Sequence, residues 1–252
     1  MAISLYSAPI TDQNPAMSDR VPPDRPPNPN FEKARALRGP LSAQLASYDG
    51  MLCALNPATG AAYGELVDHL IEVEAGKNTP GAGELLPPFL LPDDNGRLVS
   101  SAELLRKGPL VVTFNRGNWC PFCWLELSAF EDQYKAILKT GGSVVSITPD
   151  VATFSRRLKR RLGLSFPVLT DMDNGYALEM GLAVALTDDV QAVYHKAGID
   201  LGIFQRSDVW LLPIPATLLI DRRGIIRHAY VNEDFRQRFE PDQIPDILAR
   251  LD

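Results

Sequence analysis

Residues 109–130 read Pro-Leu-Val-Val-Thr-Phe-Asn-Arg-Gly-Asn-Trp-Cys-Pro-Phe-Cys-Trp-Leu-Glu-Leu-Ser-Ala-Phe, and this stretch decides the fold. A run of strand formers at 110–114 predicts a buried strand, and the polar residues at 115–118 predict a turn. Cys120 and Cys123 come next, and beyond them the apolar residues recur at helical spacing. The sequence therefore predicts a strand, a turn and then a helix whose first turn carries two cysteines.

The composition suits a large folded core and excludes two classes of partner. The chain has 252 residues, 45% of them hydrophobic, and a formal net charge of −6. This length corresponds to one generous domain, or to one domain with an added subdomain. The single basic run, Arg156 to Arg161, is typical of a solvated helix face. Without a longer basic block, we expect neither nucleic acid nor an anionic membrane as a partner.

Cysteine usage indicates a reducing compartment. The chain has three cysteines, Cys53, Cys120 and Cys123, which are too few for a disulfide scaffold. An isolated Cys-x-x-Cys beside strand–helix patterning is typical of a redox-active pair in such a compartment. The first residues lack the basic start and apolar run of a secretory signal, and no segment has the roughly 18 uninterrupted apolar residues of a membrane span. The sequence therefore predicts a soluble cytoplasmic protein.

The chain divides into four predicted regions. Residues 1–30 are rich in proline and predict a disordered tail, since they cannot bury enough apolar surface to order themselves. Helical spacing of leucines predicts an N-terminal helical hairpin at 31–76, with Asn30 as its cap. Glycine and proline mark a linker at 77–87. Residues 88–252 are then expected to form the main domain.

The main domain has the pattern of an α/β fold. Its elements follow the order β-α-β-α-β, after which come a β-hairpin at 216–231 and a terminal helix at 241–251. That order is the thioredoxin-type arrangement, in which helices cover both faces of a mixed central sheet. Residues 199–212 carry no clear pattern and are expected to be irregular. The predicted class is α/β, a thioredoxin-like fold with an N-terminal helical extension.

Two cysteines in the first turn of a helix favour the oxidation and reduction of sulfur. The unpaired N–H groups and positive dipole end of a helix N-terminus stabilise a thiolate, which lowers the pKa of a thiol from about 8.5 toward about 3.5–7.5. Pro121 fits the first turn, where its missing N–H costs little. Trp119 would shield one side of Cys120 and Cys123. Arg116 would place a positive charge beside the thiolate.

Two other interpretations of the cysteine pair are weaker. A zinc site needs two further ligands, and the other candidates are scattered along the chain: Cys53, His69, His195 and His228. An inert buried pair is compatible with the sequence, because free cysteine packs well in cores. The position at a strand–turn–helix junction favours a redox-active pair and no metal. Cys53 itself is expected to be packed and unreactive.

Residues 114–127, Phe-Asn-Arg-Gly-Asn-Trp-Cys-Pro-Phe-Cys-Trp-Leu-Glu-Leu, resemble the active-site signature of a known family. This is the peroxiredoxin-like group of the alkyl hydroperoxide reductase/thiol-specific antioxidant (AhpC/TSA) family. The stretches at 89–96, 166–171 and 213–221 resemble the same family, and the resemblance covers roughly residues 31–252. It implies a thioredoxin fold and thiol-based reduction of hydrogen peroxide or organic hydroperoxides.

The same resemblance implies how the reaction is supported. It implies no cofactor beyond a redox-active disulfide between Cys120 and Cys123, with thioredoxin or a similar thiol as the reductant. It is also compatible with a homodimer. The leading expectation is therefore a thiol peroxidase. A thioredoxin-like oxidoreductase acting on protein disulfides is the alternative, and a non-enzymatic redox sensor is a third reading.

The sequence departs from ordinary peroxiredoxins at three positions. Matching the family's Glu to Glu126 makes Cys123 the peroxide-attacking cysteine. Cys120 then stands where Thr or Ser is usual, and Arg116 stands where Pro is usual. Pro215 occupies the place of an Arg before the late strand, which is the thioredoxin pattern of a cis-proline facing the cysteines.

The roles of the two cysteines stay open on the sequence alone. If the pair works as in thioredoxins, Cys120 is the attacking thiolate and Cys123 then forms the disulfide with it. If it works as in peroxiredoxins, Cys123 attacks the peroxide and Cys120 then forms the disulfide with it. Glu126 has two readings of its own. It either accepts a hydrogen bond and shuttles a proton, or it forms a structural salt bridge.

Overall fold

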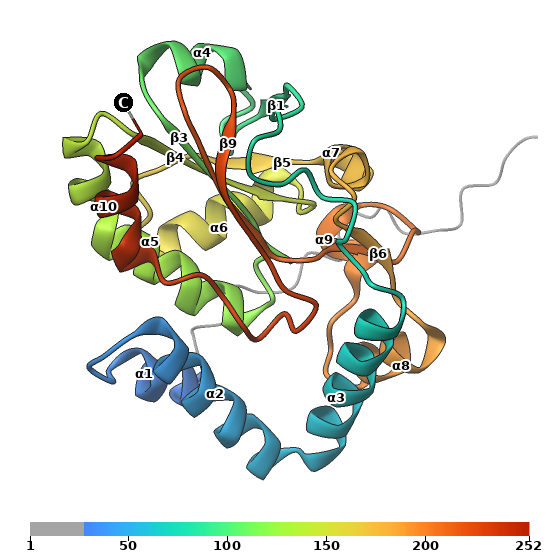
Figure 1. The fold of residues 1–252 in the computed structure, drawn as a ribbon. Coiled ribbons are helices and arrows are strands. Elements are labelled where there is room, and N and C mark those ends of the chain that lie inside the picture. Colours follow the sequence, from blue (N-terminus) through green and yellow to red (C-terminus); the bar gives the residue numbers. More distant parts are fainter. Residues whose placement is uncertain (1–27, 252) are drawn as a thin grey trace, which may run out of the picture.

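The computed structural model describes residues 28–251, so the predicted proline-rich tail lies outside the described residues except for its last three positions. At the centre is a five-stranded mixed sheet (Figure 1). Its strands in spatial order are β5 (Val168–Thr170), β4 (Ser143–Thr148), β3 (Leu110–Phe114), β8 (Ala216–Ile220) and β9 (Ile226–Val231). The middle strand β3 is fully buried and pairs parallel to β4 and antiparallel to β8. The predicted thioredoxin-like sheet is confirmed.

Helices flank this sheet, and the longest of them follows β3 directly. The helices of this part are α4 (Ser101–Lys107), α5 (Pro121–Lys139), α6 (Ala152–Leu162) and α10 (Ile244–Leu248), the last preceded by the 3-10 turn η3 (Pro241–Gln243). α5 packs against α6 and against α10. α4 ends at Gly108, where an added Cβ would lie 1.9 Å from the carbonyl oxygen of Gly141. Only glycine fits where the backbone at 108 passes this close to the backbone at 141, just before β3 begins.

The N-terminal region holds three helices where the sequence predicts two. They are α1 (Pro29–Arg35), α2 (Leu41–Leu55) and α3 (Pro57–Glu72). Asn28, and not the predicted Asn30, caps α1, because its side chain accepts a hydrogen bond from Phe31 N at 2.8 Å. Figure 1 shows α2 and α3 diverging from the corner between them, where Asn56 caps α3. The two helices are therefore splayed apart and do not lie side by side as a hairpin.

These helices pack onto the main domain. α2 packs against α5, and α3 packs against α8 (Asp188–Lys196). The ring centroids of Phe31 and Trp124 lie 5.5 Å apart, and those of Tyr63 and Phe235 lie 5.1 Å apart. The buried residues of the helices belong to the same hydrophobic cluster as those of the sheet. The N-terminal region is therefore joined to the sheet by a continuous core.

Two small two-stranded antiparallel sheets complete the architecture. They are β1 (Leu90–Pro92) with β2 (Leu98–Ser100), and β6 (Ala183–Ala185) with β7 (Leu211–Pro213), while η2 (Met172–Asn174) and α7 (Gly175–Glu179) follow β5. The prediction that 199–212 is irregular is wrong, because this stretch contains α9 (Leu201–Gln205) and the start of β7. Asp200 caps α9 by accepting a hydrogen bond from Gly202 N at 3.0 Å. A helix of five residues is too short to show a spacing pattern in the sequence.

Part of the predicted linker at 77–87 is bound to the sheet. The N–H groups of Gly83 and Leu86 donate to the carbonyl oxygens of Ile226 and Gly224 at 2.8 and 2.9 Å. The N–H of Ile226 donates in turn to the carbonyl oxygen of Glu84 at 2.9 Å. The segment is therefore pinned to the β8–β9 turn. The division of the chain into domains at this point stays a prediction.

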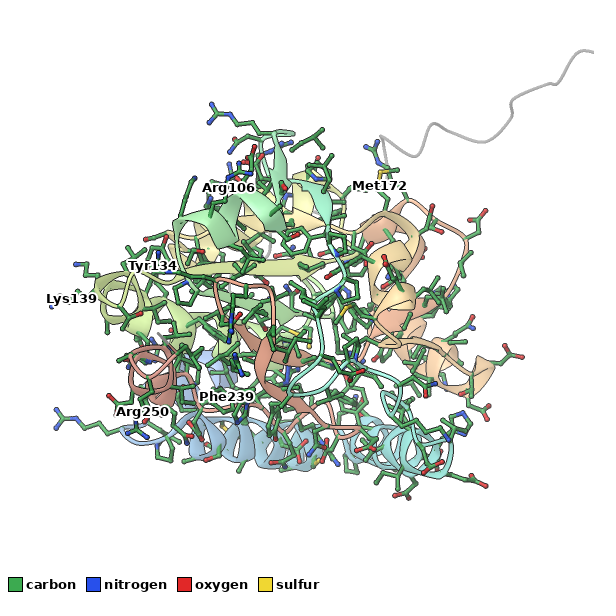
Figure 2. The ribbon with its side chains drawn as sticks, turned by 45° about the horizontal axis from the view of Figure 1, so that its top comes forward. Arg106, Tyr134, Lys139, Met172, Phe239 and Arg250 are labelled. Carbon is green, nitrogen blue, oxygen red and sulfur yellow. The ribbon has the colours of Figure 1, made fainter. Side chains whose placement is uncertain are left out.

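Charged side chains project outward over the described surface, as Figure 2 shows for Arg106, Lys139 and Arg250. Phe239, by contrast, is buried, and its ring centroid lies 4.9 Å from that of His228. Within residues 28–251, none of the helices combines the length and the apolar character needed to cross a bilayer.

Candidate active site

The two cysteines lie where β3 ends and α5 begins. Asn115 holds the turn between them, since its Nδ2 donates to Ser146 Oγ at 2.6 Å and its Oδ1 accepts from Gly117 N at 3.1 Å. Gly117 has a φ of 137°, a conformation that favours glycine. Cys120 is the N-cap residue of α5, Cys123 lies in its first turn, and both are free thiols. The strand, turn and helix predicted for 109–130 are all present.

Both sulfurs are closed off from solvent. Cys120 is 1% exposed and Cys123 is 0% exposed. The ring of Phe122, between them in sequence, lies 5.1 Å from that of Tyr48 and 6.5 Å from that of Tyr63. These tyrosines come from α2 and α3, so the N-terminal helices cover the first turn of α5.

Two hydrogen-bond donors approach Cys123 Sγ. The backbone N–H of Arg116 has its nitrogen 3.3 Å from this sulfur, and Nη2 of Arg238 lies 3.7 Å from it. Arg238 comes from the loop after β9. Its Nη1 forms an ion pair with Glu126 Oε2 at 2.7 Å, and its Nε donates to the carbonyl oxygen of Phe235 at 2.8 Å. These bonds fix the guanidinium, and its charge, beside the sulfur.

The pKa values of the two cysteines are shifted in opposite directions, because each thiol affects the ionisation of the other. Burial alone would raise the pKa of Cys120, but a hydrogen bond from Cys123 and the charges of Arg116 and Arg238 outweigh it and lower this pKa. Burial and the neighbouring thiolate raise the pKa of Cys123. The resting charge therefore lies on Cys120, while the two donors lie at Cys123. The pair titrates as one unit, and moving its single proton transfers the charge between the sulfurs.

We expect the reduced pair to lose its first proton below the free-cysteine pKa of about 8.5 and its second proton above it. The fixed charges of Arg116 and Arg238 stabilise one buried thiolate, and the first thiolate then opposes a second. Thiolate absorbance in the ultraviolet, followed against pH in a Cys53→Ser background, measures both steps. Two steps that both lie near the free value would contradict this assignment.

Arg116 lies among aromatic rings. Its guanidinium carbon is 3.9 Å from the ring centroid of Phe235, 5.0 Å from that of Trp119 and 5.8 Å from that of Tyr194. Nη2 donates a hydrogen bond to the Tyr194 hydroxyl. Burial opposes its charge, but Tyr194 and Cys120 more than compensate and raise the pKa of Arg116. Arg116 is therefore a permanent buried cation stacked on Trp119.

Pro215 lies between β7 and β8 and is buried. It lines a narrow pocket together with Arg116 and with apolar side chains from α3, β6 and β7. The sequence likens this residue to the cis-proline of thioredoxins, but every peptide bond within residues 28–251 is trans. That part of the prediction is wrong. Trans is the form that X–Pro bonds prefer by about 0.5–1 kcal/mol.

Glu126 forms the salt bridge that the sequence left as one of two readings. Burial raises the pKa of Glu126 to about 7, although the charge of Arg238 opposes this rise. The sequence analysis did not identify Arg238, nor Tyr194, which binds Arg116. No motif marks either residue, because each reaches the site from a distant part of the chain.

The remaining candidates lie outside this cluster. Cys53 packs where α2 meets α3, and a Cβ added to Gly60 would lie 2.7 Å from its Sγ. His195 is exposed, and its ring centroid lies 4.9 Å from that of Trp210. Within the described residues, no three His, Cys, Asp or Glu side chains are grouped so that they could hold a metal ion.

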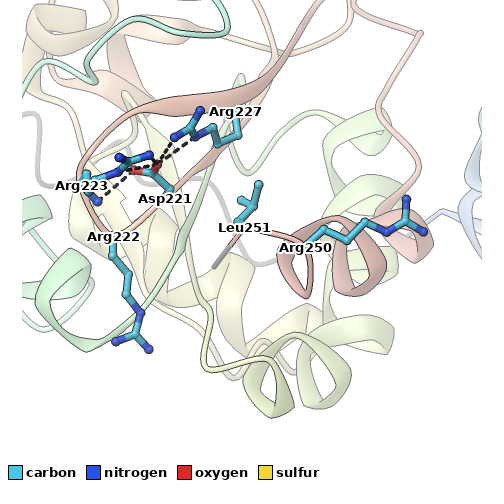
Figure 3. A pocket seen from close by; sticks show the side chains of 6 residues that line it. All are labelled: Asp221, Arg222, Arg223, Arg227, Arg250 and Leu251. Atoms are coloured by element: carbon cyan, nitrogen blue, oxygen red, sulfur yellow. Dashed lines mark hydrogen bonds and ion pairs between the residues drawn. The ribbon is translucent and has the colours of Figure 1, made fainter.

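A wide surface hollow of about 710 Å³ lies at the other end of the sheet. Figure 3 shows Arg223 and Arg227 bound to Asp221 there, with Arg222 and Arg250 at its sides. Asp221 follows the end of β8, which pairs with the start of β3, whereas the cysteines follow the end of β3. The hollow is therefore separated from the cysteines by the length of the strand.

The sheet and its flanking helices define a thioredoxin-like fold, and the matches that follow place the chain among the thiol-dependent oxidoreductases of that fold. The AhpC/TSA family model matches residues 82–229, more than half of the chain, and the chain belongs to this family. It is similar to chloroplastic peroxiredoxin Q of Sedum lineare, with 28% identity over 170 residues that cover 67% of this chain and 76% of that protein.

Two further comparisons agree. Chloroplastic peroxiredoxin Q of Oryza sativa subsp. japonica is 27% identical over 161 residues, which cover 64% of this chain and 61% of that protein. The crystal structure of peroxidoxin BcpB from Mycobacterium tuberculosis superposes with a TM-score of 0.52 at 22% identity, covering 67% of this chain and 94% of that one. This last likeness shows the shared fold.

Proposed function

We propose that this chain is a thiol-dependent peroxidase that reduces hydrogen peroxide or organic hydroperoxides with Cys120 and Cys123. The observation that carries the proposal is the guanidinium of Arg238, fixed 3.7 Å from Cys123 Sγ by its ion pair with Glu126. A cation at this place stabilises charge on the attacking sulfur and on a peroxide oxygen next to it. Family membership and the similarity to proteins named peroxiredoxin Q support the reaction class.

The reaction uses both sulfurs. The shared proton moves to Cys120, and the Cys123 thiolate attacks one peroxide oxygen, which breaks the O–O bond and leaves Cys123 as a sulfenic acid. The other oxygen takes a proton and leaves as an alcohol, or as water from hydrogen peroxide. The Cys120 thiol then displaces the sulfenic hydroxyl as water and forms the Cys120–Cys123 disulfide. An external dithiol reduces this disulfide and becomes oxidised itself.

The neighbouring side chains have supporting roles in this proposal. Arg116 and Arg238 supply the positive charge that ordinary peroxiredoxins draw from an Arg before the late strand. Trp119 stacks on the Arg116 guanidinium and shields the site. Pro121, at the first position of α5, sets the direction of the helix. Pro215 lines the pocket that reaches Arg116.

The same chemistry indicates the electron donor, the compartment and the assembly that this proposal includes. The electron donor is thioredoxin or a similar thiol, and the chain works without a cofactor other than its own disulfide. A reducing compartment such as the cytoplasm keeps the pair ready for the next peroxide. One chain holds both sulfurs and both arginines, so the reaction needs no residue from a second chain. The scheme is therefore compatible with a homodimer in which each chain has a complete site.

Adding one equivalent of hydrogen peroxide to the reduced chain tests the proposal. We expect two thiols to disappear per peroxide consumed, with Cys53 still free, and a dithiol to restore both. A Cys53→Ser variant serves as the control and should react at the same rate. Peroxide that oxidises the chain no faster than it oxidises free cysteine would overturn the proposal.

A thiol–disulfide oxidoreductase is the second candidate, and one observation favours it. The resting charge lies on Cys120, the N-cap residue, which is the attacking position in thioredoxin logic. Reduction of insulin disulfides by the reduced chain, without fast oxidation by peroxide, would favour this candidate over the peroxidase.

A further inference from the structure

A buried polar niche lies beside the cysteine pair, around Gly117. Asp150, two residues after the end of β4, is 0% exposed, and its Oδ2 accepts a hydrogen bond from Asn118 N at 2.6 Å. Its other oxygen, Oδ1, is buried and has no hydrogen-bond partner. Trp119 is 8% exposed, and its Nε1 is also buried without a partner. One carboxyl oxygen and one indole N–H are therefore unused in the same place.

The two unused atoms converge on one point. A Cβ added to Gly117 would lie 2.7 Å from Asp150 Oδ1 and 2.7 Å from Trp119 Nε1. Gly117 directly follows Arg116, whose N–H approaches Cys123 Sγ at 3.3 Å. Only glycine lets the carboxyl and the indole N–H approach the backbone this closely, so both atoms lie against the turn whose Arg116 N–H reaches Cys123 Sγ.

Burial and the nearby Cys123 keep the Asp150 carboxyl protonated. Burial raises the pKa of Asp150 to about 8, and the charge of Cys123 adds to this, whereas the hydrogen bond from Asn118 opposes it. Two cations near this turn favour the ionised form: Arg116 precedes Gly117, and Arg161 on α6 donates to Asn118 O at 3.4 Å. Burial outweighs them, so the carboxyl carries a proton at neutral pH, which a group that donates protons requires.

The peroxide reaction needs a proton for the oxygen that departs. When thiolate attack breaks the O–O bond of an alkyl hydroperoxide, the departing oxygen is an alkoxide, a strong base that leaves readily only when protonated. We propose that Asp150 is the general acid that protonates this departing oxygen. In this proposal Trp119 Nε1 donates a hydrogen bond to the same oxygen and so positions it for the proton transfer. This proposal rests on the peroxidase function.

The protons balance over one cycle. Asp150 gives its proton to the departing oxygen, and the alcohol leaves with Asp150 as a carboxylate. Disulfide formation then consumes the proton of Cys120 in the water that departs. Reduction of the disulfide by an external dithiol releases two protons and returns the pair as one thiol and one thiolate. One proton stays on the pair, and the other returns to the Asp150 carboxylate.

The choice of leaving group tests this role. With tert-butyl hydroperoxide the departing oxygen is a strong base, whereas with peracetic acid it is acetate, which leaves without a proton. Asp150→Asn, which keeps the size of the side chain, is expected to slow oxidation by tert-butyl hydroperoxide about 100-fold and to change the rate with peracetic acid little. Stopped-flow tryptophan fluorescence of the reduced full chain follows both reactions.

A matched control separates chemistry from folding. Asp171→Asn removes another buried carboxylate, one that accepts hydrogen bonds from Tyr176 N and Ala177 N at 2.8 Å each. We expect this variant to keep the wild-type ratio between the two peroxide rates. An Asp150→Asn variant that slows both peroxides equally, or neither, overturns the proposal for Asp150.

Two further outcomes keep the test decisive. A wild-type chain that reacts with neither peroxide would overturn the peroxidase function itself, which is a distinct result. If Asp150→Asn fails to fold, the wild-type rates in H₂O and D₂O decide the matter. A larger isotope effect with tert-butyl hydroperoxide than with peracetic acid shows that a proton reaches the departing oxygen in the slow step, as the proposal requires, and equal effects overturn the proposal.

Discussion

Cys123→Ser is expected to abolish peroxide reduction, whereas Cys120→Ser is expected to keep one oxidation per molecule and to lose turnover. The reason is the placement of donors, since Arg116 N and Arg238 Nη2 lie 3.3 and 3.7 Å from Cys123 Sγ. They stabilise charge on that sulfur during attack, and losing such stabilisation costs about 10²–10³-fold in rate. In Cys120→Ser the attacking sulfur is intact, but its sulfenic acid has no neighbouring thiol to condense with.

Both variants are compared in a Cys53→Ser background, which removes the third thiol without touching the pair. Single-turnover oxidation by hydrogen peroxide, trapping of the sulfenic acid with dimedone, and steady-state turnover with a dithiol measure the three steps separately. The dimedone adduct is expected on Cys120→Ser and absent from Cys123→Ser. The opposite pattern would assign the attack to Cys120 and place the chain with the thioredoxin order of events.

The local part of the site could be predicted from the sequence. The strand at 110–114, the turn and the helix that follows are encoded by apolar spacing over about 30 consecutive residues. Arg116 and Trp119 lie within that stretch, so their proximity to the cysteines follows from the chain itself. Their stacking on each other is a consequence of the short turn.

The distant part of the site could not be predicted in the same way. Arg238 lies in a charged loop that has no periodic pattern, and it falls outside the 82–229 range matched by the family model. Asp150 and Tyr194 reach the turn only because β4 pairs with β3 and α8 packs against α3. Tyr48 of α2 and Tyr63 of α3 lie over the first turn of α5 only because these two helices meet at a corner. Such placements come from tertiary packing, which spacing along the chain does not encode.

Arg238→Met is expected to lower both stability and reactivity. The side chains of Arg238 and Glu126 are each 1% exposed and form an ion pair at 2.7 Å. Removing one partner leaves the other buried alone, and such a change costs about 3–5 kcal/mol of unfolding free energy. The cation beside Cys123 is lost as well, so single-turnover oxidation by hydrogen peroxide is expected to slow by about 10²-fold.

The stability loss should depend on pH in a known direction. Arg238 lowers the pKa of Glu126 against the effect of burial, which raises it to about 7. Without Arg238 this pKa rises further, so Glu126 is neutral at low pH and resists ionisation in the folded state. A group whose folded pKa is raised loses its contribution to stability as pH rises. Urea unfolding is therefore expected to show a deficit, relative to the wild type, that is smaller at pH 5 than at pH 8.

The double variant Glu126→Met with Arg238→Met separates the two effects. Replacing a buried ion pair by apolar side chains of similar volume is often neutral or stabilising, so we expect most of the lost stability to return. The peroxide rate is not expected to return, because the cation beside Cys123 is still missing. Recovery of both quantities would mean that Arg238 serves the fold alone, and the charge that activates Cys123 would then have to come from Arg116, whose guanidinium is bound to Tyr194 and stacked on Phe235.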